Sequence, residues 1–376
     1  MLKRLLLPIL LILLSFAAGW LSQQFFSSQK NQGLLNPFVT QEPQEPEKPL
    51  LELTIPELRE RTYIPSTIEV LEELETTESY TAYLFQYTTL GKTMTGQLNV
   101  PTEVKTENPP VIVLLRGYVP PASYQTGVGT KSAAEVFAEN GYLTLAPDFF
   151  GYGGSDPEPE DSWQSRFEKP ISVIELIKSI QTIGIPLHST TSATFTTSTI
   201  GIWAHSNGGQ IALTTLEVLS EPIPTTLWAP VTAPFPYSVL FFSDEAEDEG
   251  KSSRLWISQF EKLYDVFDFS LSQHLHYLTG PLQIHQGMID DAVPYSWNDE
   301  FVAKITTENS RREAVTAEQE TLATMAAETE SETTVLLDKI EMSYYRYPGT
   351  DHNMRPSWNT AIQRDLEFFS SELPQL

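Results

Sequence analysis

The sequence contains no cysteine among its 376 residues. This absence excludes disulfide bonds, cysteine-ligated zinc, iron–sulfur clusters, a thiol nucleophile and a lipid-modified N-terminal cysteine. A hydrophobic core must therefore hold the fold together without covalent cross-links. Apolar residues make up 40% of the chain and aromatic residues 11%, which is enough to build such a core.

Positive charge is also scarce. The chain has 23 lysines and arginines against 49 aspartates and glutamates, a formal net charge of −26. Nucleic-acid phosphates require clustered cations, so we expect no nucleic-acid partner. Much of the acid lies in two segments, 244–249 and 306–335. We therefore expect the negative charge to belong to the surface rather than to a functional site.

A long uncharged apolar run extends from Leu5 to Leu21, directly after Lys3 and Arg4. It is short for a membrane span and slightly long for the core of a signal peptide. The preceding cations predict a cytoplasmic start and an extracytoplasmic body. We therefore expect residues 1–22 to be an uncleaved signal anchor. A cleaved signal peptide, which would release a secreted protein, and a buried N-terminal helix are the less favoured alternatives.

The rest of the chain divides by composition. Residues 23–50 are rich in Gln, Ser, Pro and Glu, which predicts an extended, disordered tether. Residues 51–376 are expected to form one domain with two interruptions. Segment 231–275 lacks clear strands and could form a small cap over the site. Segment 306–335 is acidic with little apolar content, which predicts an exposed helical or disordered insertion.

Strands and helices alternate through the domain. Tyr80–Tyr87 and Thr93–Val100, separated by a short turn, predict a β-hairpin. Short apolar runs bounded by turn residues are typical of strands buried on both faces. Such strands are predicted at Val111–Leu115, Tyr142–Leu145, Ile200–Ala204, Thr226–Trp228, Leu282–His285 and Ser343–Tyr347. Helices are predicted at Lys131–Asn140, from Pro170 onward, at Gln210–Leu219 and at Ser357–Ser371. This alternation indicates an α/β fold with a mostly parallel central sheet flanked by helices.

The segment Gly201–Gly209 carries the clearest chemical signal. A predicted buried strand leads into Ser206 and a helix follows directly, which is the arrangement of a nucleophile elbow. Small residues at Ala204 and Gly208 suit such a turn, because it brings backbones close together. The following helix N-terminus would point N–H groups at developing negative charge. Ser206 is therefore predicted to be a nucleophile rather than part of an ordinary glycine-rich turn.

A serine nucleophile needs a base. Six histidines are present: His188, His205, His274, His276, His285 and His352. Its position after the last strand selects His352 as the base. His205 adjoins Ser206 and is expected to pack beside the elbow with its ring pointing away from the nucleophile. His285 lies in a buried strand and is expected to be a core residue.

The base needs a carboxylate to orient it. Asp290 and Asp291 directly follow the end of a strand, and either could serve. Asp351 is too close to His352 in sequence to orient its ring easily, so we expect it to be a loop residue. The oxyanion hole is expected to combine the N–H of Asn207 with that of Tyr118, which follows the strand Val111–Leu115.

Together these segments resemble the α/β-hydrolase family, and most closely the catalytic domain of the prolyl oligopeptidase group and dienelactone-hydrolase-like proteins. The resemblance runs from about Tyr80 to the C-terminus. It depends on motifs in the family's order: Leu115–Tyr118, Asp148–Ser155, Ala204–Gly209, Gly287–Pro294 and Gly349–His352. In the family the acid stands three residues after the glycine and three before Val-Pro. The resemblance therefore implies Asp290 rather than Asp291 as the acid. We assign the turn at Asp148–Ser155 a structural role at the rim of the site.

The chain departs from the family in three places. Arg116 stands where the family often has histidine, which affects the second oxyanion donor. Ala204 replaces the first glycine of the elbow, a tolerable change. We expect no β-propeller of the prolyl oligopeptidase kind, because each blade needs about 40–45 residues and only about 30 residues lie between the tether and the hairpin.

Two functional classes follow from this reading. In the first, the chain is a membrane-tethered serine hydrolase with a Ser206–His352–Asp290 triad that needs no cofactor or metal. The resemblance implies serine-type peptidase activity on short peptides, with carboxylesterase activity on small esters as the alternative. In the second, the chain is a non-catalytic binding protein on a hydrolase scaffold, which an intact triad disfavours.

Overall fold

In the computed structural model, the described residues are 48–104, 109–186, 194–244, 248–325 and 338–373. The predicted signal anchor (residues 1–22) and nearly all of the predicted tether lie outside this part of the chain. Within the described ranges, no helix is both long and apolar enough to cross a bilayer. Leu50, placed in the tether by composition, is buried, and its N–H donates a hydrogen bond to the Tyr264 hydroxyl (3.1 Å). The packed body therefore begins before residue 51.

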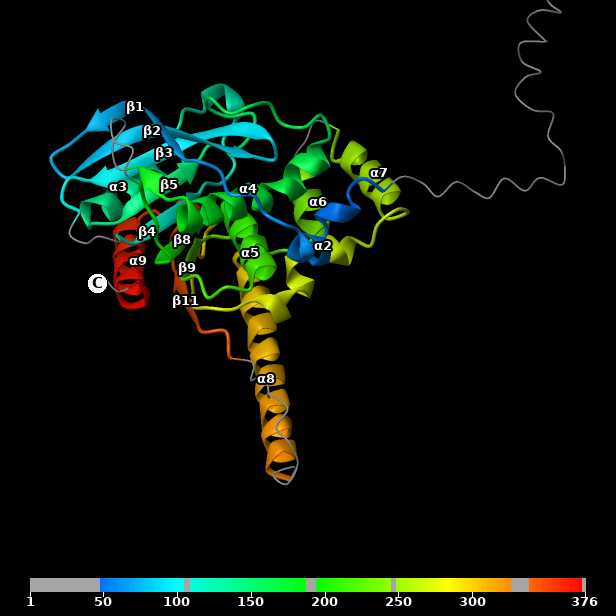
Figure 1. Cartoon of the computed structure of the whole chain (residues 1–376). Coiled ribbons are helices and arrows are strands. Elements are labelled where there is room, and N and C mark those ends of the chain that lie inside the picture. The colour runs from blue at the N-terminus through cyan, green and yellow to red at the C-terminus, as the bar shows by residue number, and fades with distance from the viewer. Residues whose placement is uncertain (1–47, 105–108, 187–193, 245–247, 326–337, 374–376) are drawn as a thin grey trace, which may run out of the picture. The chain divides into compact units, whose positions relative to one another are not determined.

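A nine-stranded sheet forms the centre of this body, in the order β1-β2-β3-β5-β4-β8-β9-β10-β11 (Figure 1). Its strands are β1 (Glu69–Thr76), β2 (Tyr80–Thr89), β3 (Lys92–Pro101), β4 (Val111–Leu115), β5 (Leu143–Pro147), β8 (Ile200–His205), β9 (Thr225–Trp228), β10 (Leu282–Gly287) and β11 (Met342–Tyr347). From β5 through β4 to β11 all neighbours are parallel, whereas β1, β2 and β3 add an antiparallel edge. The predicted mostly parallel sheet and hairpin are confirmed.

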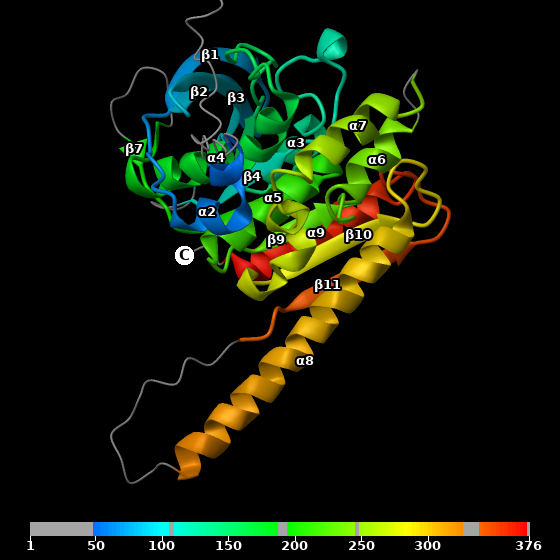
Figure 2. The ribbon, with the colours of Figure 1, turned by 90° about the vertical axis from the view of Figure 1, so that its right-hand side faces the viewer.

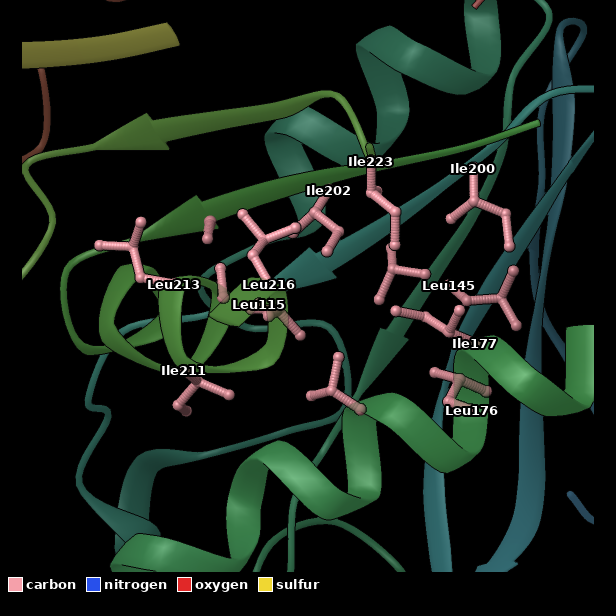
Figure 3. Close-up of a cluster of buried hydrophobic side chains, with 14 of the residues drawn as sticks. Leu115, Leu145, Leu176, Ile177, Ile200, Ile202, Ile211, Leu213, Leu216 and Ile223 are labelled. Atoms are coloured by element: carbon pink, nitrogen blue, oxygen red, sulfur yellow. The ribbon is translucent and has the colours of Figure 1, made fainter. Parts of the chain in front are cut away.

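Helices cover both faces of the sheet. They are α3 (Lys131–Glu139), α4 (Ser162–Thr182), α5 (Asn207–Leu219), α8 (Tyr295–Met325) and α9 (Trp358–Glu372). Successive residues of β4 point to opposite faces. Leu115 joins the cluster with α4 and α5, which includes Ile177 and Leu216 (Figure 3), whereas Leu114 joins the cluster with α3 and α9. Two apolar layers therefore fix the positions of the strand ends that carry the site.

The start of α4 differs from the prediction. Pro170 was expected in the first turn, but the helix begins at Ser162, and Pro170 lies inside it. The side chain of Asp161 caps the helix by accepting a hydrogen bond from the N–H of Trp163 (2.8 Å). Phe167, in the segment ahead of the proline, is buried, so packing favours the longer helix. This extension brings Arg166 and its neighbours into the molecule's main cavity.

The segment predicted to be a cap is mostly helical. It contains α6 (Tyr237–Ser243), α7 (Lys251–Phe260) and the short 3-10 turns Val266–Phe269, Leu271–Gln273 and Leu275–Tyr277. Its aromatic side chains pack against α4 and against the first described residues, which form the 3-10 turn Leu51–Leu53 and the helix α2 (Ile55–Glu60). The cap and the first described residues therefore share one hydrophobic cluster.

The acidic segment predicted at 306–335 is helical as far as it is described. It belongs to α8, which begins at Tyr295 and extends away from the sheet (Figures 1 and 2). The buried Arg312 fastens this helix to the body, because its guanidinium donates to the carbonyl oxygens of Leu278 (2.9 Å) and Asp338 (2.7 Å). Helix α8 is therefore held to the body at Arg312, and its later turns extend beyond this attachment.

Candidate active site

Ser206 lies at the junction of β8 and α5, in a strained turn. Its backbone has φ 56° and ψ −120°, a conformation that L-residues rarely adopt. The neighbouring glycines allow this close turn, since a Cβ at Gly208 would lie 2.1 Å from the carbonyl oxygen of Leu115. A Cβ at Gly209 would lie 2.4 Å from the Cβ of Pro230. The geometry is that of a nucleophile elbow, which holds the serine hydroxyl clear of the sheet.

His352 and Asp290 form a pair at the ends of β11 and β10. His352 Nδ1 lies 2.8 Å from Asp290 Oδ2, and His352 lines the same cavity as Ser206. The Asp290 side chain is inaccessible to solvent. Its Oδ1 accepts hydrogen bonds from the N–H groups of Ala292 (2.9 Å) and Val293 (2.7 Å).

The ionisation of this pair follows from its hydrogen bonds. Burial opposes the charged form of Asp290. The hydrogen bonds from His352, Val293 and Ala292 outweigh it, so the pKa of Asp290 lies below its ordinary value. An ionised Asp290 accepts the Nδ1–H of His352, which leaves Nε2 of the imidazole as the basic nitrogen. Asp291 is exposed, and the Asp351 carboxylate instead accepts hydrogen bonds from its own loop at Asn353 and Arg355.

A buried row of side chains that the sequence did not reveal supports Asp290. Gln286 Nε2 donates to Asp290 Oδ2 (3.2 Å), and Gln286 Oε1 accepts from Asn298 Nδ2 (2.5 Å). Asn298 Oδ1 in turn accepts from the hydroxyl of Thr232 (2.9 Å), in the cap segment. These residues lie on a strand, a helix and a loop, and no local pattern links them. Only the tertiary fold brings them together.

The two predicted oxyanion donors flank the nucleophile. A Cβ added at Gly117 would lie 2.9 Å from Ser206 Cβ, so the loop after β4 passes directly over the elbow. The N–H of Tyr118 has no hydrogen-bond partner among the described residues. The N–H of Asn207 is in the first turn of α5, where helical N–H groups have no partner in the helix. Both groups are therefore available to a developing oxyanion.

Arg116, which departs from the resembled family, braces this loop. Its guanidinium is buried and donates to the carbonyl oxygens of Gly117 (2.9 Å) and Asp148 (2.8 Å). It also lies over the rings of Tyr124 and Tyr152, at 4.5 and 4.0 Å from their centroids. The Gly117 carbonyl and the Tyr118 N–H share one planar peptide and point in opposite directions. Holding the carbonyl therefore sets the direction of the N–H.

Hydrogen bonds to the Asp148 side chain fix the turn Asp148–Ser155 beside the site. Asp148 accepts hydrogen bonds from the hydroxyls of Thr95 (2.6 Å), Tyr124 (2.7 Å) and Thr126 (2.9 Å). Burial nevertheless raises the pKa of this carboxyl above its ordinary value. Tyr152 from the same turn lines the cavity.

His205 packs beside the elbow, and its ring contacts the predicted base. The ring lies 4.7 Å from that of His352, measured between centroids, and its Nε2 is 3.0 Å from the His352 carbonyl oxygen. Burial first, and then the neighbouring His352, lower the pKa of His205 to about 4. His205 is therefore neutral near pH 7, and its Nε2–H donates to the backbone of the predicted base.

One cavity of about 980 Å³ contains these groups. Ser206, Asn207, Tyr118 and His352 line it. Many of its other lining residues are apolar, and they come from the 3-10 turn Leu51–Leu53 and from α2, α4 and α6: Leu53, Ile55, Trp163, Phe167, Val239 and Phe242. The described ranges contain no cluster of three or more potential metal ligands.

Comparisons with known proteins agree with this architecture. No family model matches the sequence, and no curated protein matches it. Among solved structures, an acetyl xylan esterase from Paenibacillus sp. R4 is similar, with a TM-score of 0.57, 15% identity, and coverage of 83% of this chain and 91% of the other. Acetyl xylan esterase 1 from Thermoanaerobacterium sp. JW/SL YS485 gives a TM-score of 0.52 at 16% identity, covering 82% and 89%.

A puromycin-hydrolyzing peptidase of Mycobacterium tuberculosis is also similar. Its TM-score is 0.53 at 14% identity, and the match covers 80% of this chain and 41% of the other. At such identities the likeness concerns the fold. It confirms that the described body has the α/β-hydrolase fold that the sequence motifs imply.

Proposed function

We propose that this chain is a serine hydrolase that cleaves carboxylic esters, with Ser206, His352 and Asp290 as its catalytic triad. The observation that supports it best is one cavity lined both by Ser206, on a strained elbow, and by a histidine whose Nδ1 is 2.8 Å from a buried carboxylate. A nucleophile, a base and an orienting carboxylate are the groups that acyl transfer needs.

In the proposed mechanism, His352 Nε2 takes the proton of the Ser206 hydroxyl as its oxygen attacks the ester carbonyl. The N–H groups of Tyr118 and Asn207 stabilise the oxyanion, and Asp290 stabilises the imidazolium. The imidazolium then protonates the leaving alcohol, which leaves an acyl-enzyme on Ser206. A water molecule, deprotonated by His352, attacks the acyl-enzyme, and the acid product leaves.

The cavity favours esters over peptides with a free N-terminus. Its wall is largely apolar, and the cations Arg166 and Lys169 line it beside Glu158, the one carboxylate among the described residues that line the cavity. A peptidase that binds an α-ammonium group needs acidic side chains close to the nucleophile. Of the solved structures named above, two are also described as esterases. Peptidase activity is the alternative that the experiment must separate from ester hydrolysis.

Labelling with a fluorophosphonate tests the reaction class. Wild-type protein should carry the label on Ser206, and the Ser206→Ala variant should not. A panel of p-nitrophenyl esters and aminoacyl and prolyl p-nitroanilides then tests the substrate. Ester turnover well above amide turnover is the expected result. A folded but unlabelled wild type would refute the hydrolase, and amide turnover equal to ester turnover would favour the peptidase.

We also propose that residues 1–22 tether the domain to a membrane and present it outside the cytoplasm. The support is the apolar run that follows Lys3 and Arg4. Membrane fractionation and protease accessibility of the full chain in cells test this location. Release of the body into the medium would instead indicate a cleaved signal peptide.

A further inference from the structure

Two cations of α4 line the proposed catalytic cavity. Arg166 and Lys169 are three residues apart, so their side chains leave the helix on the same side. Both line the cavity that contains Ser206 and His352. In a chain with a net charge of −26, two cations in one largely apolar cavity require an explanation.

Arg166 has no counter-ion in the described part of the chain. No described carboxylate lies within 4 Å of its guanidinium, whose Nη2 donates to the Gln210 side-chain oxygen (2.6 Å). Its Nε is buried and has no hydrogen-bond partner there. Burial lowers the pKa of Arg166 to about 10. Arg166 is half-buried, and leaving its buried Nε without a partner is costly for the free protein, a cost that a bound anion would relieve.

Lys169 is only weakly neutralised. Glu158 Oε1 is 3.9 Å from its Nζ, and the Glu158 side chain is 40% exposed. Burial lowers the pKa of Lys169 below its ordinary value. The nearby Glu168 does not line the cavity; burial raises its pKa, and it accepts a hydrogen bond from Gln164 (3.3 Å).

Gln210 links the guanidinium to the helix that follows the proposed nucleophile. Gln210, whose side-chain oxygen accepts from Arg166 Nη2, lies in the first turn of α5, and that helix begins directly after Ser206. A helical turn rises about 5.4 Å. A group bound by Arg166 would therefore lie within a few bonds of a carbonyl attacked by Ser206.

We propose that Arg166 and Lys169 form a subsite for a carboxylate of the substrate, so that the preferred ester carries a negative charge a few bonds from its scissile carbonyl. The planar guanidinium suits a carboxylate, and Lys169 adds a second charge. This subsite depends on the proposed ester hydrolysis, because it names the substrate class of the same cavity.

Matched ester pairs test the subsite on the full chain. For the acyl side, the p-nitrophenyl hemiester of adipic acid is compared with p-nitrophenyl hexanoate, after subtraction of the rate with Ser206→Ala. For the alcohol side, 4-acetoxybenzoate is compared with 4-acetoxybenzamide. Wild type should prefer the charged member of one pair in kcat/KM on the order of 10- to 100-fold. No preference in either pair would overturn the proposal.

Variants assign the preference to these residues. Arg166→Gln should remove most of the ratio of charged to neutral kcat/KM, and Lys169→Glu should invert it. Lys178→Gln is the matched control, because Lys178 is on α4 but pairs with Glu221 (2.6 Å) outside the cavity. That control should keep the wild-type ratio. An unchanged ratio in folded Arg166→Gln and Lys169→Glu would contradict the subsite.

A binding measurement separates this proposal from the proposed function. Absent fluorophosphonate labelling would refute the hydrolase but not the anion site. Adipate should raise the unfolding temperature of wild type more than 1,6-hexanediol does at equal ionic strength, and Arg166→Gln should lose that difference. Equal unfolding temperatures for wild type in the two compounds would overturn the subsite.

Discussion

At the scale of single residues, the site depends on neighbours that set the protonation and direction of each group. Hydrogen bonds lower the pKa of Asp290, which favours its ionised form. Because Asp290 accepts the Nδ1–H of His352, Nε2 is left as the basic nitrogen of that imidazole. Arg116 does the same for a peptide plane, because it holds the Gly117 carbonyl. The largest effects are therefore expected at Ser206, the proposed nucleophile, at Arg116, and at His205, whose ring contacts that of His352.

Replacement of Ser206 by alanine should abolish acyl-enzyme formation. We expect kcat to fall by a factor on the order of 10⁴–10⁶, because the other groups of a triad act only through the nucleophile. Steady-state kinetics on a p-nitrophenyl ester measure this, with circular dichroism to show an intact fold. A fall of less than about tenfold in a folded variant would exclude Ser206 as the nucleophile.

Replacement of Arg116 by methionine should weaken the oxyanion hole. The Gly117 carbonyl loses its donor, so the Tyr118 N–H is no longer held in direction, and kcat should fall by about 10- to 100-fold. Arg116→His, the residue common in the resembled family, should retain more activity because imidazole can still donate one hydrogen bond. Equal activity of wild type and Arg116→Met would show that the loop positions itself.

The neutral His205 predicts how stability depends on pH. Its pKa is about 4 in the folded chain and about 6.5 when unfolded, so the unfolded state binds more protons between these values. Stability is complete above about pH 6.5 and falls as the pH drops toward 4, by up to about 1.4 kcal/mol per pH unit for this group. Burial also lowers the pKa of His274 and His276, which add to the same slope.

Urea unfolding at pH 5 and pH 7 of wild type and His205→Gln isolates that contribution. The variant should lose less stability than wild type on acidification. The same slope in both proteins would mean that His205 is protonated in the folded state or exposed to water.

At the scale of elements, the sequence predicts most of the sheet and the chemistry at its strand ends. Uninterrupted apolar runs bounded by turn residues, such as Val111–Leu115, are typical of strands buried on both faces, and the elbow follows one of them. The acidic edge strand β1 was missed because its residues are mostly exposed and lack apolar alternation. The eight residues of α4 ahead of Pro170 were missed because tertiary burial, not local propensity, keeps the helix going through a proline.

Some residues of the candidate site could be predicted from the sequence, and others could not. Ser206, His352 and the Asp290/Asp291 choice could be read from local motifs, whereas Gln286, Asn298 and Thr232 could not, since three separate elements meet there. The orientation of His205 also escaped the sequence, because it depends on the loop that carries His352.

Asp365, a buried carboxylate on α9, should contribute strongly to stability where α9 packs on the sheet. Asp365 accepts hydrogen bonds from Thr226 (2.5 Å), Trp228 (2.7 Å) and Gln283 (2.9 Å), on β9 and β10. Asp365→Ala leaves these donors without a partner and should lower the free energy of unfolding by on the order of 3–5 kcal/mol. The exposed Glu367→Ala on the same helix is the control and should change it by less than about 0.5 kcal/mol. Equal effects of the two substitutions would contradict the role of this contact.

At the scale of the whole molecule, the start of the described body is part of the cavity wall. Leu53, Ile55 and Leu58 line the cavity and pack with the cap. A chain that begins at residue 48 should therefore fold and hydrolyse esters as the full chain does. A chain that begins at residue 62 should lose this wall, and its kcat/KM on an apolar ester should fall at least tenfold. Equal activity of the two truncated chains would show that this segment is dispensable.

The contact between Thr232 and Asn298 has a consequence for redesign. Thr232 belongs to the segment that covers the cavity, yet its hydroxyl ends the row of side chains that supports Asp290. Grafting the whole of residues 231–275 from another enzyme would change the reactivity together with the selectivity. The interchangeable part of the cap therefore begins after Thr232, and a library confined to Val239, Phe242 and Phe269, which line the cavity, varies the recognition of the substrate while leaving the support of the proposed acid intact.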